Sequence, residues 1–399
     1  MAPQRGPGSL PFPDRPAGTD CLPGIDHIVI LMKENHSYDN YFGMLKRGDG
    51  FTLGPDGTPQ NSNPDKQGRP VRVHHVSLPV NNPLHVSQTW NDSHRQWNGG
   101  KMDGFVTTTN SHDPMGYLNG DDLPWYYGFA STYGIGDRYF SSLLGQTFPN
   151  RKFLQAATAA GQVNDSIPNP FGRPPAGGLI WDRLNEHSID WANYFVEAPD
   201  VALWPREVLR QHDHLHELNE FYEDCRHGRL PPVSLITPEI FLSDEGEFED
   251  DQIGESFTAS VFEAATASPQ WRSMMFIIVW DEGGGYYDHV PPPAAVPPDD
   301  IPPGIHVPPD EPGGYDRYGF RVPCLVASPF SKPGHVSSAV YDHTSILATI
   351  EWKWNLPALT RRDAAATPLT DFLDPESTPH FETPAELPRP TIWPFTGKR

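Results

Sequence analysis

Two short apolar runs, each ending abruptly in polar residues, constrain the fold of this 399-residue chain more than any other feature. Residues 25–32 read IDHIVILM and are followed by Lys33-Glu34-Asn35, and residues 274–280 read MMFIIVW and are followed by Asp281-Glu282. Apolar runs of this length are typical of strands that are buried on both faces of a sheet. Both runs are far shorter than the roughly 18 residues that a membrane helix needs.

Further strands and helices are predicted to alternate along the chain. Strands are expected at 190–196, 233–236 and 322–328, and helices at 150–160, 207–225, 257–267 and 344–354. This alternation predicts an α/β fold with a mainly parallel sheet and helices on both faces. Ligands of such sheets bind outside the carboxyl ends of the strands, where the polar residues at 33–37 and 281–282 are expected to lie.

Proline and glycine predict long, stiff loops within a folded protein. The chain has 46 Pro and 35 Gly, about a fifth of its residues, which is below the ~25–30% at which disorder becomes the default. We expect an extended arm at 1–24, an α/β domain at 25–360 and a Pro-rich tail at 361–399. Within the domain, residues 290–314 are too rich in proline for a helix or a central strand and predict a polyproline-like loop.

Charge and cysteine content exclude several classes of protein. The net charge of −22 disfavours binding to nucleic acid and to anionic lipid surfaces, because both carry negative charge. Cys21, Cys225 and Cys324 lie too far apart in sequence for a zinc cage or a disulfide framework, although one disulfide is possible. No apolar signal segment is visible at the N-terminus, so a cytoplasmic location is expected, or secretion if a leader has been removed. The oligomeric state stays open.

The two polar strand ends offer oxygen ligands for a metal ion. Glu34 and Asn35 supply a carboxylate and an amide, and Asp281 and Glu282 supply two carboxylates. Such hard ligands suit Mg²⁺, Mn²⁺ or Ca²⁺, or Zn²⁺ in an oxygen-rich site. Either pair alone could also be ordinary strand-end polarity.

Thr147 is the candidate nucleophile. In the segment GQTFPNR (145–151), Pro149 fits the first turn of a helix and places Thr147 at the N-terminus of that helix. A hydroxyl there faces free N–H groups that suit a phosphate, and a nearby cation would lower its pKa. The alternative is that Thr147 only caps the helix.

Three histidines could protonate a leaving group or hold a phosphate oxygen, namely His94, His289 and His343. Taken singly, each could equally have a structural role. The run HDHLH at 212–216 is interpreted as the surface face of a helix and not as a metal site, because no third type of ligand lies near it in the sequence.

Residues 26–43, DHIVILMKENHSYDNYFG, resemble the opening motif of the bacterial and plant phosphoesterase family. That family includes non-specific phospholipases C and an acid phosphatase branch. Four further segments resemble the family in the same order, at 94–105, 137–153, 280–293 and 319–354. The resemblance implies an alkaline-phosphatase-like fold and hydrolysis of phosphate esters at a divalent metal ion.

The resemblance also implies roles for the candidate residues. Thr147 matches a Ser or Thr nucleophile that also contacts the metal ion. The other implied metal ligands are Glu34, Asn35, Asp281 and Glu282. Phosphate binding and proton transfer are implied for His94, His289 and His343.

One position departs from the family pattern. Members often carry a histidine in a loop that reads D-E-H-P-P, whereas this chain has Gly246 there, within the acidic sequence DEGEFED (244–250). This loop could bind a second cation or a cationic head group, and the change leaves the substrate class open.

The sequence therefore supports three hypotheses. The first is a metal-dependent, phospholipase C-like phosphodiesterase that acts through a phosphothreonine intermediate. The second is an acid phosphatase that hydrolyses monoesters. The third is a non-catalytic scaffold protein that keeps the fold and binds partners through the Pro-rich loop and an acidic face.

Overall fold

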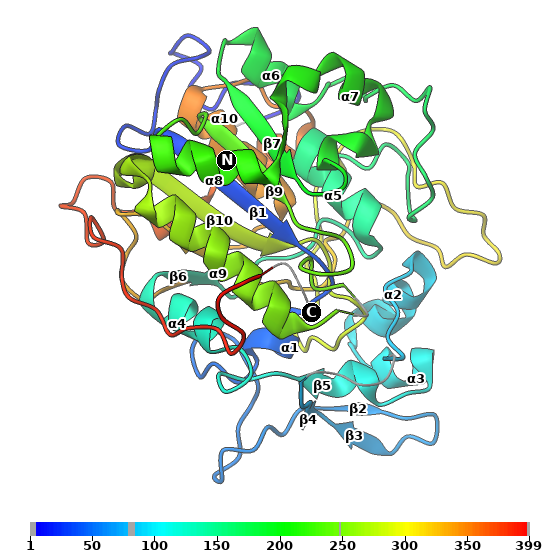
Figure 1. Ribbon diagram of the computed structural model, residues 1–399. Helices are drawn as coiled ribbons and strands as arrows, with labels where there is room; N and C mark the ends of the chain where they lie inside the picture. Colours follow the sequence, from blue (N-terminus) through cyan, green and yellow to red (C-terminus); the bar gives the residue numbers. More distant parts are fainter. Residues whose placement is uncertain (1–4, 79–83, 247–248, 397–399) are drawn as a thin grey trace.

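An eight-stranded sheet forms the centre of the computed structural model, which describes residues 5–78, 84–246 and 249–396 (Figure 1). The strand order is β12-β6-β11-β10-β1-β9-β7-β8. In chain order, the strands are β1 (His27–Lys33), β6 (Gly134–Gly136), β7 (Trp191–Phe195), β8 (Leu215–Glu217), β9 (Val233–Thr237), β10 (Met274–Trp280), β11 (Cys324–Ala327) and β12 (His335–Ser337). All neighbouring pairs are parallel except the two that involve β11, so the predicted mainly parallel sheet is confirmed.

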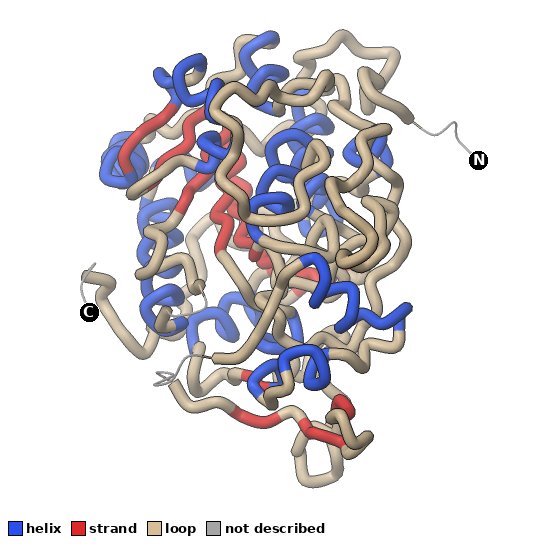
Figure 2. Tube along the Cα trace, turned by 90° about the vertical axis from the view of Figure 1, so that its right-hand side faces the viewer, coloured by secondary structure: helices blue, strands red, loops and turns tan. Residues whose placement is uncertain are grey.

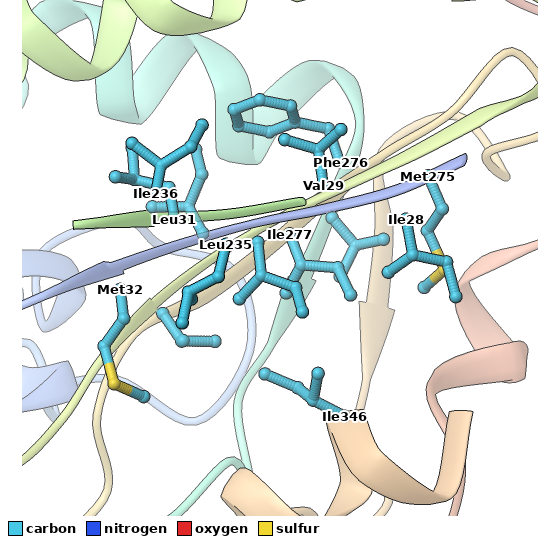
Figure 3. Close-up of a cluster of buried hydrophobic side chains, with 14 of the residues drawn as sticks. Ile28, Val29, Leu31, Met32, Leu235, Ile236, Met275, Phe276, Ile277 and Ile346 are labelled. Carbon is cyan, nitrogen blue, oxygen red and sulfur yellow. The ribbon is translucent and has the colours of Figure 1, made fainter. Parts of the chain in front are cut away.

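The central strands β1 and β10 are buried on both faces, as their apolar runs predict. They pair in register from His27 opposite Met274 to Lys33 opposite Trp280. Successive side chains point to opposite faces, so Phe276 lies on one side of the sheet while Ile277 lies on the other, with Ile346 (Figure 3). Each fully buried aliphatic side chain of this kind contributes about 1.5–3 kcal/mol to stability.

Helices cover both faces of the sheet, which confirms the predicted layers (Figures 1 and 2). On one face α8 (Leu218–His227) packs against α9 (Asp251–Ala267), and Phe262 of α9 contacts Phe276 of β10 with 5.3 Å between ring centres. On the other face α5 (Thr147–Ala156) packs against α10 (His343–Trp354).

Shorter elements complete the fold. The remaining helices are α1 (Tyr38–Phe42), α2 (Trp90–Trp97), α3 (Phe105–Thr109), α4 (Pro124–Thr132), α6 (Ile180–Glu186), α7 (Pro205–Arg210) and α11 (Arg361–Ala365). The remaining strands are β2 (Ser62–Pro64), β3 (Pro70–Arg72), β4 (His74–His75) and β5 (Gly116–Tyr117). Figure 1 shows β2 to β5 with α2 and α3 below the main sheet.

The single helix predicted over 207–225 is wrong. The chain instead forms α7, a 3₁₀ turn at His212–His214, strand β8 and then α8. Residues 215–217 pair with 193–195 of β7, and the His214 ring stacks on Trp191 with 4.4 Å between ring centres. The free edge of β7 thus draws this segment into the sheet. Helical periodicity along the sequence contains no information about that edge.

The histidine run at 212–216 therefore lies on a turn and an edge strand, not on a helix. His214 Nδ1 lies 2.8 Å from the Trp191 carbonyl oxygen, and His216 Nδ1 lies 3.1 Å from Glu220 Oε2. Each histidine has its own local partner.

Three predicted helix boundaries shift for local reasons. The helix predicted at 150–160 begins at Thr147 and ends at Ala156, because Ala157 adopts a left-handed conformation with φ of 55°. The helix predicted at 257–267 begins at Asp251, where the side chain of Asp250 accepts a hydrogen bond from the Gln252 N–H. The helix predicted at 344–354 begins one residue earlier, at His343.

The proline-rich segments run over the body of the protein. Residues 290–314 form an irregular excursion, coloured yellow in Figure 1, with an isolated bridge between Ala294 and Arg317. The N-terminal arm packs on the end of α10, where the N–H groups of Gly18 and Cys21 donate to the carbonyls of Trp354 and Lys353. The three cysteines are unpaired. Among the described helices, none is both long and apolar enough to cross a membrane.

Candidate active site

The carboxyl ends of β1 and β10 place the two predicted ligand pairs side by side. The parallel pairing continues one residue past the strands, because the Asp281 N–H donates to the Lys33 carbonyl oxygen at 3.0 Å. The Asn35 N–H, in turn, lies 3.3 Å from Asp281 Oδ1. Glu34-Asn35 and Asp281-Glu282 are therefore neighbours although nearly 250 residues separate them in the chain.

Gly284 allows the two strand-end loops to touch. Its φ is +61°, and a Cβ atom at this position would lie 1.9 Å from the Asn35 carbonyl oxygen. Such an approach excludes any side chain, so glycine is required here. The backbone of one ligand pair thus rests directly against the loop that carries the other pair.

Helix α5 brings Thr147 to these strand ends. Thr147 is the first residue of α5, and its Oγ1 donates to Glu34 Oε1 at 3.0 Å. The loop before α5 is held by Asn150, whose Oδ1 accepts from the N–H groups of Ser142 and Leu143 at 2.9 and 3.1 Å. The candidate nucleophile and one candidate metal ligand are therefore in direct contact.

The first turn of α5 offers fewer free N–H groups than the sequence predicts. The Phe148 N–H donates to Asp165 Oδ1 at 2.7 Å, and Pro149 has no N–H. The helix N-terminus therefore provides little direct binding for a phosphate through these two residues.

Arg151 lies one helical turn after Thr147 and contacts three carboxylates. Its Nε donates to Asp281 Oδ2 at 2.9 Å, its Nη2 to Asp244 Oδ2 at 2.9 Å and its Nη1 to Asp200 Oδ1 at 3.2 Å. We call Arg151, these three aspartates, Glu34 and Glu282 the Arg151 cluster.

No role is predicted from the sequence for Arg151 or Asp200, and Asp244 is predicted only as part of the acidic loop. Two signals could have identified more of them. Arg151 is four residues after Thr147 on the same helix and so shares its face. Asp244 follows the carboxyl end of β9, which is the neighbour of β1 on the side opposite β10.

The carboxyl groups of the Arg151 cluster carry more negative charge than the arginine neutralises. Burial, reinforced by the charge of Asp281, raises the pKa of Glu34 to about 7, and burial raises the pKa of Asp281 to about 7. Burial also raises the pKa values of Asp244 and Glu282 well above their ordinary range. Such shifts are expected where ionised groups lose water without gaining enough partners.

Two oxygen atoms of the cluster show this lack of partners directly. Glu282 Oε1 and Asp244 Oδ1 are buried and have no hydrogen-bond partner among the described residues. The potential metal-ligand atoms nearby are oxygens of carboxylate, amide and hydroxyl groups, which divalent cations prefer. The residues present therefore fit a divalent metal ion at this place, as the sequence predicts, while its identity stays open.

Thr147 and Glu34 open into a cavity of about 570 Å³. Its polar lining residues also include Asn35, Arg151 and Asp244. Its apolar lining residues include Phe148, Ile167, Leu203, Ile240 and Phe241. A ligand of this cavity would therefore combine a polar or charged group with an apolar one.

His343 lies behind the site and is held neutral. Its Nε2 donates to the Asp281 carbonyl oxygen at 2.7 Å, which leaves Nδ1 to accept from the Tyr139 hydroxyl at 3.1 Å. Burial lowers the pKa of His343 to about 4. The ring contacts the backbone of a candidate ligand and does not line the cavity.

The structure does not bring His94 to the Thr147 cavity. His94 lies on α2, where its Nδ1 donates to the Trp90 carbonyl oxygen at 2.7 Å. It lines a separate cavity of about 340 Å³ together with Trp97 and Arg317. Phosphate binding and proton transfer by His94 stay a prediction.

His289 belongs to a second ionic cluster, which we call the Arg321 cluster. The buried Arg321 donates to Asp288 Oδ1 at 2.9 Å and to Asp39 Oδ1 at 3.0 Å, and His289 Nδ1 lies 2.7 Å from Asp39 Oδ2. Burial lowers the pKa of His289, but the hydrogen bond and charge of Asp39 outweigh this and raise it to about 9.

The acids and the histidine of the Arg321 cluster are close enough together to hold a metal ion. Both aspartates also contact the guanidinium group of Arg321. Burial still raises the pKa of Asp288 to about 6, against the opposing charge of Arg321.

Gly246 lies beside Glu34. A Cβ atom on Gly246 would lie 2.9 Å from Glu249 Oε1 and 3.4 Å from Glu34 Oε2. The Glu249 carboxylate spans the loop, because it accepts from the N–H groups of Phe241 and Glu245 at 2.8 and 2.9 Å. A carboxylate thus lies next to the position where the family often has a histidine.

Comparison with known proteins agrees with these observations. The model of the phosphoesterase family matches residues 25–357. Non-specific phospholipase C1 of Arabidopsis thaliana is 30% identical over 91% of this chain and 74% of its own length. Phospholipase C A of Mycobacterium tuberculosis is 30% identical over 96% of this chain and 83% of its own length.

A crystal structure of a protein in the alkaline phosphatase superfamily from Vibrio parahaemolyticus matches with a TM-score of 0.42 and 10% identity. The match covers 89% of this chain and 71% of the Vibrio parahaemolyticus chain.

The family model covers most of the chain, including the Thr147 helix, both strand-end loops and the Arg321 cluster. The chain therefore belongs to the phosphoesterase family, and its class is the one that its residues predict, a phosphoric ester hydrolase.

Proposed function

We propose that this enzyme hydrolyses phosphodiesters in the manner of a phospholipase C, with Thr147 as the nucleophile. The observation that carries the proposal is the contact of 3.0 Å between Thr147 Oγ1 and Glu34 Oε1, in a cavity lined by both polar and apolar side chains. The relatives named phospholipase C support the same class of substrate.

In the first step, Thr147 Oγ1 gives up its proton to water and forms a bond to phosphorus. The hydrogen bond from the hydroxyl to Glu34 Oε1 orients Thr147 for this attack. The bond from phosphorus to the alcohol oxygen breaks, and the alcohol leaves with the bonding electrons. The phosphoryl group, still carrying its head group, stays on Thr147 as a phosphothreonine ester.

In the second step, water attacks the phosphorus of the phosphothreonine ester and passes one proton to the carboxylate that protonated the leaving alcohol. The bond from phosphorus to Thr147 Oγ1 breaks, and Oγ1 takes a proton back from solvent. Net hydrolysis consumes one water molecule and releases the alcohol and the phosphorylated head group. His343 acts as a positioning residue, because its hydrogen bond fixes the backbone of Asp281.

The leaving alcohol needs a proton, and Gly246 has no side chain to supply it. Asp244 and Glu249 line the same cavity, and burial raises the pKa values of both. A protonated carboxyl group in this loop is therefore our candidate acid.

We assign metal binding to Glu34, Asn35, Thr147, Asp281 and Glu282. A divalent cation held there would neutralise charge on the phosphoryl oxygens and lower the pKa of the Thr147 hydroxyl.

Diesters suit this cavity better than monoesters for two reasons. A diester carries one negative charge and a monoester up to two, and the cavity already holds a surplus of carboxylates. The apolar lining residues can also contact a second, apolar ester group.

Substitution of Thr147 tests the nucleophile. Thr147→Ala should lower turnover of p-nitrophenyl phosphorylcholine by about 10³-fold or more, while Thr147→Ser should stay within about tenfold of the parent. Acid quenching of the parent should trap a labelled Thr147 that mass spectrometry detects. Retention of activity within about tenfold by Thr147→Ala would refute covalent catalysis at this residue.

Two further measurements separate the alternatives. Faster hydrolysis of p-nitrophenyl phosphate than of p-nitrophenyl phosphorylcholine would favour a phosphomonoesterase. The absence of bound metal in the purified protein, together with no chelator-sensitive turnover, would favour a non-catalytic scaffold.

A further inference from the structure

Large apolar side chains project into solvent at the mouth of the Thr147 cavity and, in the case of Phe171, in the loop that continues from it. Ile167 is 91% exposed, Phe171 83%, Phe241 78% and Ile240 39%. Three of these residues, Ile167, Ile240 and Phe241, also line the cavity itself. We call these four residues the mouth surface. Exposed apolar groups that cluster at the entrance of a site mark an interaction surface.

Phe241 is held in an unfavourable conformation that keeps its side chain outside. Its φ is +69°, in the left-handed region that bulky residues rarely adopt. Two carboxylates clamp the backbone here, because the Phe241 N–H donates to Glu249 Oε1 and the Ile240 N–H donates to Glu197 Oε2, each at 2.8 Å. The fold therefore maintains an exposed aromatic side chain at some cost in strain.

The second part of the mouth surface is stiffened by proline. Residues 166–175 read SIPNPFGRPP, so Ile167 precedes one proline and Phe171 follows another. Proline limits the conformations of the neighbouring backbone, so less conformational entropy is lost when the adjacent side chains bind a partner. Both parts of the mouth surface are therefore held in place before binding.

The charges next to the mouth surface select the kind of partner. Glu197 precedes the cavity-lining Ala198, and Glu239 precedes Ile240, while Arg173 follows Phe171 by two residues. Two carboxylates and one guanidinium therefore accompany the apolar side chains, and the balance is negative. A bilayer of zwitterionic lipid presents cationic ammonium groups at its outer surface, which complement these carboxylates. An anionic bilayer would repel them, and the net charge of −22 would add to the repulsion.

We propose that the mouth surface docks on a zwitterionic phospholipid bilayer and inserts Ile167, Phe171 and Phe241 below the head groups. This inference rests on the proposed function, since it specifies how a lipid diester would reach Thr147 from the membrane. Docking would place the cavity entrance, marked by the exposed lining residues Ile167, Ile240 and Phe241, against the bilayer.

Binding to phosphatidylcholine vesicles tests the docking without turnover. The full chain carrying Thr147→Ala should sediment with the vesicles, and this background prevents consumption of the lipid. Adding Phe241→Asn or Ile167→Asn should weaken partitioning by about tenfold each, and both together by about 100-fold. Asparagine tolerates the left-handed backbone at position 241, so these variants should unfold within a few degrees of their background.

Leu209→Asn provides the matched control. Leu209 is 83% exposed, on α7, and does not line the Thr147 cavity. This variant should bind the vesicles as well as its background does. Replacing about a third of the phosphatidylcholine by phosphatidylglycerol at low salt should weaken binding of the unmodified mouth surface.

Three results would overturn the docking surface. They are unchanged binding by the Phe241→Asn, Ile167→Asn combination, an equal loss with Leu209→Asn, and tighter binding to the anionic vesicles. Failure of the proposed function gives a different result, namely no hydrolysis of soluble p-nitrophenyl phosphorylcholine by the parent, and it leaves vesicle binding unaffected.

Discussion

The Arg151 and Arg321 clusters grow from the same two segments of the chain but differ in charge balance. The segment after β1 supplies Glu34 to the first cluster and Asp39, on α1, to the second, and the loop after β10 supplies Asp281 to the first and Asp288 to the second. In the Arg321 cluster, a guanidinium and a histidine of raised pKa face two buried aspartates, and the histidine also contacts Asp49, which is more exposed. In the Arg151 cluster, one guanidinium faces three aspartates and has two glutamates nearby.

This difference supports the proposed division into a functional Arg151 cluster and a structural Arg321 cluster. A buried set with similar numbers of opposite charges has its partners within the set, and removal of one member is costly. An unbalanced set persists where another cation completes it, and the Arg151 cluster is the one that opens into the Thr147 cavity. Under this division, nearby positions in one segment, such as Glu34 and Asp39, serve chemistry and stability separately.

The largest expected difference between the clusters is in turnover. Asp281→Asn should lower kcat for p-nitrophenyl phosphorylcholine by about 10³-fold, because it removes a proposed metal ligand. Asp288→Asn, the matched change in the Arg321 cluster, should keep kcat of the folded protein within about tenfold. Similar losses of kcat in both variants would contradict the division of roles.

The next largest effect concerns stability. Arg321→Met should lower the free energy of unfolding by about 3–5 kcal/mol, because it leaves two buried carboxylates without their partner. Urea denaturation measures this loss, and added divalent cation should not restore it. Arg321→Lys is the control and should lose less, since it keeps the charge. A full rescue of Arg321→Met by the cation would show that this cluster also binds metal.

Binding of a divalent cation should depend on pH in a defined direction. The carboxyl pKa values of Glu34 and Asp281 are raised to about 7, so without metal their contribution to stability is present at acid pH and is lost as the pH rises through 7. The cation competes with these protons. It should therefore stabilise the protein by about 2–3 kcal/mol at pH 8, at a concentration near 100 times its Kd, and by much less at pH 5.5.

Thermal unfolding with Mg²⁺, Mn²⁺, Ca²⁺ or Zn²⁺ added in turn measures this stabilisation and also ranks the metals. The Asp281→Asn variant should lose most of the shift. A shift that grows towards acid pH would contradict the assignment of these ligands.

The smallest expected effect is the titration of His289. Its pKa is raised to about 9, so the ion pair with Asp39 adds stability that is complete below pH 6.5 and is lost as the pH rises through 9. His289→Gln should cost about 1–2 kcal/mol at pH 6 and less at pH 10. Equal costs at both values of pH would show that the charge of His289 is unimportant.

The sequence predicted the sheet and the strand-end loops well, because their signals are local. The apolar runs of β1 and β10 admit few structures other than buried strands, and parallel pairing then places Glu34 near Asp281. The sequence also predicts that Thr147 meets the strand-end ligands, and Thr147 contacts Glu34.

The features that the sequence does not predict depend on contacts between distant parts of the chain. The edge of β7 converts residues 215–217 from a predicted helix into β8. The burial of Arg151 among three aspartates depends on loops from β7, β9 and β10 that meet only in space. The separation of His94 and His289 from Thr147 likewise reflects the path of the chain, which residue types alone do not specify.

The register of β1 against β10 determines the spacing between Glu34 and Asp281, whereas the loops at 164–172 and 196–202 and around 240 build the cavity mouth. Under the proposed assignment, the residues that act on the phosphate and those that admit the substrate therefore lie in different segments of the chain. We expect an exchange of the entrance loops to change the substrate that enters while it leaves the strand-end ligands in place.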